Sequence, residues 1–173
     1  FFDHDHGGFY FTADDHETLM HRPKPLSDDA TPSGNGIAAL ALQRLGFLLG
    51  ESRYLVAAET TLKSAWPALE EYPHGHVSLI TALEEHRQHP EIIIIRGDDD
   101  DIDNWRASAA KLYAPRRLVF AIPGDETGLP GALADRKPAD GETIAYRCVG
   151  SHCSLPITSW EALAVELSES AAT

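Results

Sequence analysis

The sequence contains few of the features that mark secreted, membrane-spanning or nucleic-acid-binding proteins. It has two cysteines among 173 residues, Cys148 and Cys153, which are too few for a small secreted scaffold built from disulfide bonds. Its longest run of Val, Ile and Leu covers residues 92–95, whereas a membrane-spanning helix needs about 20 apolar residues. The formal net charge is -13, which makes nucleic acid and anionic membrane surfaces poor partners. We therefore expect an acidic, soluble, cytoplasmic protein.

The signatures of common catalytic sites are also missing. The sequence has no G-x-S-x-G elbow, no P-loop, no protein-kinase motif set and no H-E-x-x-H zinc motif. Gly34, Gly36 and Ala39 match the spacing of a dinucleotide-binding fingerprint. That fingerprint must follow a buried strand, and here it follows Thr31-Pro32-Ser33, so glycines leading from a loop into a capped helix are the favoured interpretation. The residues alone predict no cofactor and identify no reaction.

The chain opens in a dense stretch of motif residues. It starts at Phe1, without an initiator methionine, and continues Phe-Asp-His-Asp-His-Gly-Gly through Gly8. Natural N-termini are usually bland and mobile. We therefore expect a piece of a larger protein that is not a complete enzyme by itself.

Residues 1–89 predict a loop followed by helices. Residues 9–12 are β-prone, which suits a short strand, and residues 21–32 hold three prolines, which suits an ordered loop or lid. Helices are expected from a cap at residues 33–35 to Gly50, from about 52 to 70 and from about 75 to 88. The short link between the first two predicts an antiparallel hairpin. The apolar stripe of the first helix is expected at Ile37, Leu40, Ala41, Leu45 and Leu48.

Residues 90–173 predict a small α/β part. Buried strands are expected at residues 91–97, 117–123 and 143–148. A helix follows the first strand, a short helix is expected near residues 129–134, and Thr158 is expected to cap a last helix. This order favours a small parallel or mixed sheet with flanking helices, so the fold class is α+β to α/β.

Clusters of acidic and histidine residues suggest metal ions only weakly. The acidic run at residues 98–101 lacks EF-hand spacing, and carboxylates at the start of a helix are usually a solvated turn. A second cluster near the N-terminus has no zinc signature, and solvated or hydrogen-bonded loop residues are the favoured interpretation. Its members are Asp3, His4, Asp5, His6, His16 and His21. We predict no metal site.

The two cysteines lie at the end of the third expected strand. Cys148 and Cys153 have neither the C-x-x-C spacing of a thioredoxin-type site nor a four-ligand zinc pattern. Reduced structural thiols, a local disulfide and half of a shared metal site all remain open. Gly150 permits a sharp turn that brings the two together, but a cytoplasmic setting keeps thiols reduced. We therefore predict two nearby free thiols without zinc.

Several blocks of the sequence are distinctive as a set. They are Phe2-Asp3, residues 7–10, residues 22–35, the strand at 91–97 that ends in Gly-Asp, and a closing motif of Asp140-Gly141, residues 145–148, Cys153 and residues 156–158. In these blocks the chain resembles the C-terminal half of the YyaL and spermatogenesis-associated protein 20 family, often called thioredoxin domain-containing proteins. Asp29 departs from the Gly or Asn that the family pattern leads us to expect.

The resemblance implies a layout for the parent protein. It implies an N-terminal thioredoxin-like domain, an (α/α)6 toroid similar to N-acylglucosamine 2-epimerases and six-hairpin glycosidases, and a C-terminal extension. This chain would hold the last helical hairpins of the toroid at residues 1–89 and the extension at residues 90–173. The implied partners are a carbohydrate ligand and the rest of the parent chain, including the thioredoxin-like domain.

Two function hypotheses follow from this layout. In the first, the toroid binds or isomerises a carbohydrate, because charged and amide groups in a stiffened loop suit hydroxyl recognition. The candidate ligand-binding residues are Asp3, His6, Arg22, Asp28 and Asn35. In the competing interpretation, Asp28 and Asn35 only cap a helix and the loop. In the second hypothesis the chain is a non-catalytic scaffold or interaction module coupled to the redox domain, with Cys148 and Cys153 as candidate redox residues.

Overall fold

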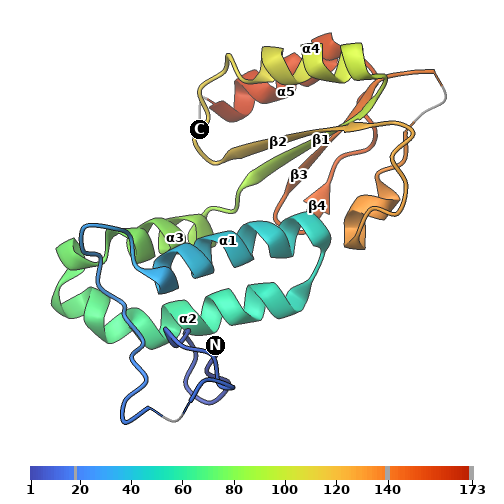
Figure 1. The fold of residues 1–173 in the computed structure, drawn as a ribbon. Coiled ribbons are helices and arrows are strands. Elements are labelled where there is room, and N and C mark those ends of the chain that lie inside the picture. Colours follow the sequence, from blue (N-terminus) through green and yellow to red (C-terminus); the bar gives the residue numbers. More distant parts are fainter. Residues whose placement is uncertain (18, 139–140, 172–173) are drawn as a thin grey trace. The chain divides into compact units, whose positions relative to one another are not determined.

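The computed structural model describes residues 1–17, 19–138 and 141–171, and Asp140 of the closing motif lies outside them. The described chain divides into two compact units, Phe1–Gln88 and His89–Thr173. The first is helical and the second is built on a mixed sheet with flanking helices (Figure 1). The α+β class predicted from the sequence is confirmed. No helix within the described ranges is long and apolar enough to cross a membrane.

The first unit is built from α1 (Gly34–Leu49), α2 (Ser52–Glu71), the 3-10 turn η1 (Pro73–Gly75) and α3 (Val77–Arg87). The Ser33 hydroxyl caps α1 by accepting the amide of Gly36, and Gly50 ends the helix in the left-handed conformation, as predicted. The third helix begins two residues later than expected, because the chain first forms η1. The core of the first unit consists of Ala39, Leu62, Ala65, Leu69, Leu79 and Ala82.

The face of α1 that packs inside this unit is not the predicted aliphatic stripe. Its buried residues are Asn35, Gly36, Ala39, Gln43 and Gly46, whereas Ile37 and Leu45 are exposed. Leu40 of the predicted stripe packs against the core, but the prediction was wrong for Ile37 and Leu45, because small residues let another face of α1 approach its neighbours closely. A Cβ atom at Gly36 would lie 2.9 Å from the backbone carbonyl carbon of Ser78 in α3, and one at Gly46 would overlap Leu55 in α2.

The second unit contains β1 (Glu91–Gly97), α4 (Asp99–Ala109), β2 (Arg117–Pro123), the 3-10 turn η2 (Gly131–Asp135), β3 (Ile144–Val149), β4 (His152–Cys153) and α5 (Trp160–Ala171). The described strands lie in the order β2-β1-β3-β4. β1 runs parallel to β2 and antiparallel to β3, and β3 forms a hairpin with β4. The sheet is therefore mixed, and sequence reasoning missed only the two-residue β4 among these strands.

One face of this sheet is covered by α4 and α5, which lie on the same side (Figure 1). Ile93, Ile95 and Ala145 from the sheet pack there against apolar side chains of both helices. At the end of the same face, the Glu91 carboxylate accepts hydrogen bonds from Arg117 of β2 and Arg147 of β3. This partly buried ion group links the three neighbouring strands β2, β1 and β3.

Two local predictions need correction. Residues 9–12 form no strand, and the described loop has only a single bridge between Phe2 and Phe9, because the backbone of Phe9 is hydrogen-bonded to a side chain of α1 instead. The cap of α5 is Ser159 and not Thr158, since the Ser159 hydroxyl accepts the amide of Ala162. Thr158 lies one residue too early to reach the first turn.

The close approach at Gly36 can be tested with a matched pair of substitutions. We expect Gly36→Ala to lower the free energy of unfolding by about 1–3 kcal/mol, because the added methyl group forces α1 away from α3. Gly34→Ala, in the same helical turn, meets nothing within 4 Å and should leave stability unchanged or raise it by up to about 1 kcal/mol. Urea unfolding measures both, and equal stabilities of the two variants would contradict the packing.

Candidate functional site

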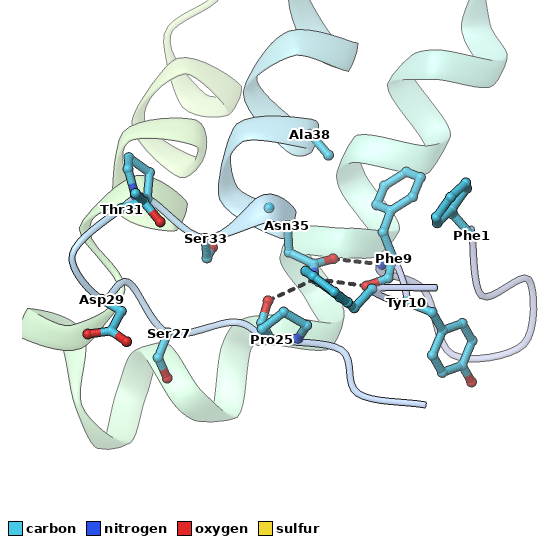
Figure 2. A pocket seen from close by; sticks show the side chains of 13 residues that line it. Phe1, Phe9, Tyr10, Pro25, Ser27, Asp29, Thr31, Ser33, Asn35 and Ala38 are labelled. Carbon is cyan, nitrogen blue, oxygen red and sulfur yellow. Dashed lines mark hydrogen bonds between the residues drawn. The ribbon is translucent and has the colours of Figure 1, made fainter. Parts of the chain in front are cut away.

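An open pocket of about 660 Å³ lies between the N-terminal loop and the start of α1 (Figure 2). Aromatic side chains line one part of it, and polar side chains of the segment from Ser27 to Asn35 line another. In Figure 2 Phe1 and Phe9 lie on one side of Asn35, while Ser27, Asp29 and Thr31 lie on the other. The lining residues all belong to the first unit.

Asn35 stands at the centre of this arrangement and is only 1% exposed. Its side-chain oxygen accepts the amide of Phe9 at 2.6 Å, and its amide nitrogen donates to the carbonyl groups of Phe9 at 3.0 Å and Pro25 at 2.9 Å (Figure 2). Both donor hydrogens are therefore used, which leaves one acceptor lone pair for a ligand. Asn35 joins two loop segments to α1.

The Asp3 carboxylate holds the N-terminal part of the loop together. Its carboxylate is 6% exposed and accepts the Lys24 ammonium at 2.7 Å, the Tyr10 hydroxyl at 2.9 Å and the backbone amides of Asp5 and His6. The Lys24 ammonium, with these other donors, holds the pKa of the Asp3 carboxyl well below its usual range despite burial. In turn, the hydrogen bond to Asp3 raises the pKa of the Tyr10 phenol. Asp3 is a permanently charged anchor of the loop.

Arg22 and His6 have different surroundings. The Arg22 guanidinium lies 4.2 Å from the centre of the Tyr10 ring and donates to the carbonyl of Thr12. These contacts hold two parts of the loop together. The His6 side chain is 80% exposed, with Nδ1 3.6 Å from a carboxylate oxygen of Asp3. Neither residue lines the pocket.

Asp28 connects the loop to the starts of α1 and α3. Its carboxylate accepts the amide of Ser33 at 2.8 Å, the amide of Ser78 at 2.7 Å and the Ser78 hydroxyl. Burial raises the pKa of Asp28, but these hydrogen bonds and the nearby His76 outweigh it, so the pKa lies below its usual value. A carboxylate at two helix N-termini also meets their positive dipole ends. This geometry gives Asp28 a structural role.

The polar groups that remain available to a ligand come from residues that sequence reasoning passed over. Within the described residues, the Asp29 carboxylate and the Thr31 hydroxyl make no hydrogen bond or ion pair, and both residues are exposed. The Phe11 ring lines the same pocket and is 74% exposed. The signal for Asp29 was present, because a carboxylate replaces the expected Gly or Asn at this position of the family pattern.

The histidine and aspartate side chains at the described start of the loop do not gather into a metal-binding cluster. Among the described residues, no group of three or more His, Cys, Asp or Glu side chains could hold a metal ion. His4, His6 and His16 are exposed, and Asp3 is engaged by Lys24. The start of the loop is held by the hydrogen bonds of Asp3 and by those of Asn35 in α1.

Cys148 and Cys153 form a disulfide bond, so the prediction of two free thiols was wrong. The two residues face each other directly in the β3–β4 hairpin, with Cα atoms 4.0 Å apart, and Gly150 makes the turn at φ +58°. The prediction relied on a cytoplasmic setting, which stays a prediction. Cys153 is exposed, Cys148 is buried, and Arg136 Nη2 lies 3.0 Å from Cys153 Sγ.

The structural role of Asp28 can be tested against its neighbour. We expect Asp28→Ala to lower the free energy of unfolding by about 2–3 kcal/mol, because it leaves the amides of Ser33 and Ser78 without their acceptor. Asp29→Ala removes the adjacent carboxylate and should change stability by less than about 0.5 kcal/mol. Denaturant unfolding at pH 7 measures both, and equal losses would contradict the assignment.

The contribution of Asp28 to folding stability should decrease as the pH falls. Because the pKa of Asp28 is lower in the folded protein, its stabilisation is complete above the unfolded-state pKa of about 3.9 and is lost as pH falls through the lower folded-state pKa. The stability difference between wild type and Asp28→Ala should therefore shrink below about pH 4. A difference that is the same at pH 7 and pH 3 would show that Asp28 does not act through its charge.

Comparison with known proteins gives one consistent relationship. No protein-family model matches the chain. Spermatogenesis-associated protein 20 is 28% identical in Rattus norvegicus, 27% in Homo sapiens and 26% in Mus musculus, in each case over 88% of this chain. The chain spans about a fifth of the length of these curated relatives, 20% in each. The resemblance predicted from the motifs is thus confirmed, and the chain is similar to one part of Spermatogenesis-associated protein 20.

Proposed function

We propose that the pocket beside α1 binds a carbohydrate in the parent protein. The observation that carries the proposal is the pairing of exposed aromatic rings with the unengaged Asp29 carboxylate across one pocket. Sugars present apolar C–H faces and hydroxyl groups together. Rings such as Phe11 offer flat apolar surface for the first, and a carboxylate forms charge-assisted hydrogen bonds with the second.

The proposal gives four of the five candidate residues an indirect role. Asp3, Arg22, Asp28 and Asn35 use their polar atoms to hold the loop in one conformation. A loop that is already fixed loses little conformational entropy when a ligand binds. His6 stays outside the lining. Recognition is therefore assigned to Asp29, Thr31 and Ser27, with the candidate residues acting as supports.

Binding is better supported than catalysis. Sugar hydrolysis normally uses two carboxyl groups on opposite sides of the reacting bond. Among the described lining residues, Asp29 supplies the only carboxylate. An isomerase or glycosidase reaction would need groups from elsewhere in the parent chain. We therefore assign this chain a share of the binding surface.

The helical unit carries apolar surface that suits packing in a larger helical array. Exposed apolar side chains occur on each of its described α-helices, and they include Ile37, Leu45, Val56, Trp66, Val77 and Ile80. Surface of this kind marks contact with other protein elements. It supports the proposal that α1, α2 and α3 belong to an (α/α) toroid in the parent protein.

Calorimetric titration of neutral and N-acylated monosaccharides into the full-length protein tests the binding proposal. We expect Asp29→Asn and Phe11→Ala each to weaken binding about tenfold, because each removes one recognition element. Both side chains are exposed, so melting temperatures should not change. Asp14→Asn, an exposed carboxylate outside the lining, is the charge-matched control. The proposal fails if no sugar binds, or if Asp29→Asn binds as tightly as wild type.

The disulfide favours a second candidate function, exchange of electrons with a dithiol partner such as a thioredoxin-like domain. A partner thiolate would attack the exposed Cys153 sulfur and release Cys148 as a thiolate, and the partner's second thiol would then release Cys153. The partner leaves oxidised to a disulfide, and this chain gains two electrons and two protons. Arg136 beside Cys153 Sγ would stabilise the thiolate formed there.

Equilibration of the full-length protein with dithiol buffers of known potential tests this candidate. An exchanging disulfide should be half reduced above about -300 mV, whereas inert structural disulfides lie below that value. Arg136→Met should lower the midpoint potential, and Arg106→Met in α4 should not. Opening the short loop should also cost about 2 kcal/mol of stability. A disulfide that stays oxidised at -300 mV would reject the exchange function.

A further inference from the structure

Arg96 occupies an unusual position at the C-terminal end of β1. Side chains alternate along a strand, so Arg96 lies on the face opposite to Ile93 and Ile95, away from α4 and α5. Its side chain is only 3% exposed. A buried guanidinium normally has a carboxylate or phosphate partner, because removal of the charge from water is costly.

Arg96 has no such partner in the described part of the chain. Its Nη2 atom donates to the carbonyl oxygens of Gly124 at 3.2 Å and Glu126 at 3.1 Å. Its Nε atom is buried without a hydrogen-bond partner, and no carboxylate among the described residues forms an ion pair with it. The contrast with Arg117 and Arg147 is direct, because both of those arginines pair with Glu91.

Arg96 lines a pocket that collects positive charge. The pocket has a volume of about 310 Å³, and its lining includes Arg136, Lys137 and Thr127 together with Glu126. Arg136 is held by the Tyr146 ring at 5.5 Å and by Cys153 Sγ. Within the described residues the Lys137 side chain forms no ion pair or hydrogen bond. Cations therefore outnumber carboxylates at this place, in a chain whose net charge is -13.

The surrounding backbone also suits a ligand site. β1 and β2 are parallel and end together at Gly97 and Pro123. Ligands of sheets with parallel strands usually bind beyond the carboxyl ends of those strands. The segment after β2, orange in Figure 1, carries η2 and returns beside β3, where the carbonyl of Lys137 accepts the Tyr146 hydroxyl. This segment forms a wall of the pocket at the ends of the parallel strands.

We propose that this pocket binds the oxyanion group of a small ligand, a phosphate or a carboxylate. The oxyanion accepts Arg96 Nε–H and the Lys137 ammonium, with Arg136 and the Thr127 hydroxyl as further donors. Guanidinium groups match the geometry of both kinds of oxyanion. The volume lies at the lower end of the range for ligand pockets, which fits a small molecule. The site belongs to the second unit and does not depend on the carbohydrate proposal.

The test uses inorganic phosphate and acetate as probes on the full chain, each titrated against chloride at constant ionic strength. We expect saturable binding of at least one probe in isothermal calorimetry, with a matching rise in melting temperature. Saturation with phosphate alone assigns a phosphate ligand, and saturation with acetate alone assigns a carboxylate ligand. Saturation with both supports the shared oxyanion chemistry.

Charge variants at the pocket give opposite expected signs. Lys137→Gln should weaken binding about threefold, and Glu126→Gln should strengthen it by a similar factor, because the first removes an attractive charge and the second a repulsive one. Lys111→Gln, an exposed lysine outside the lining, should have no effect. These variants alter exposed side chains, so the test does not require an Arg96 variant that folds.

Three outcomes would overturn the proposal. Saturation with neither probe would reject the site. Equal effects of Lys137→Gln and Lys111→Gln would indicate an adventitious ion only, attracted by general surface charge. Weaker binding by Glu126→Gln would contradict an anionic ligand.

Discussion

The first unit depends on one carboxylate that is placed between two helix starts. Asp28 accepts hydrogen bonds from the amides of Ser33 and Ser78, so a single loop residue satisfies donors at the N-termini of both α1 and α3. The contact at Gly36 lets those two starts come close enough for one side chain to reach both. The pocket is a product of this bridge, because the segment that carries Asp29 and Thr31 is fixed at Asp28 on one side and at Ser33 on the other.

The arginines of the sheet in the second unit have two kinds of partner. Arg117 and Arg147 lie on the helix-covered face of the sheet, where the Glu91 carboxylate lies between them and forms an ion pair with each. Arg96 lies on the other face of the same strand as Glu91, and its described contacts are carbonyl oxygens. Carbonyl groups satisfy hydrogen bonds but carry no full negative charge. Both faces of the sheet therefore hold guanidinium groups, but among the described contacts a carboxylate pairs only with those on the helix-covered face.

Sequence reasoning succeeded where local chemistry decides the outcome. The Ser33 cap, the Gly50 stop and the aliphatic strand at residues 91–97 follow from side-chain and backbone preferences of nearby residues. It failed where residues distant in sequence meet. The inner face of α1 is set by Ser78 and Leu55, which no periodicity in α1 reveals. The roles of Asp28 and Asn35 depend on partners up to 50 residues away, so they read as ligand groups until those partners are known. Asp29 was recognised from the sequence only as a departure from the family pattern, because nothing in its local sequence places it in the lining of a pocket.

The disulfide in the β3–β4 hairpin determines how the sheet ends. A two-residue strand such as β4 has too few backbone hydrogen bonds to hold its register alone, and the covalent link between Cys148 and Cys153 supplies that register. β4 in turn covers the end of β3, whose backbone groups would otherwise form part of an open edge. An open edge pairs readily with any extended chain that meets it. Oxidation of the two cysteines thus keeps the end of β3 paired with β4, so that those backbone groups of β3 are not open to strand addition.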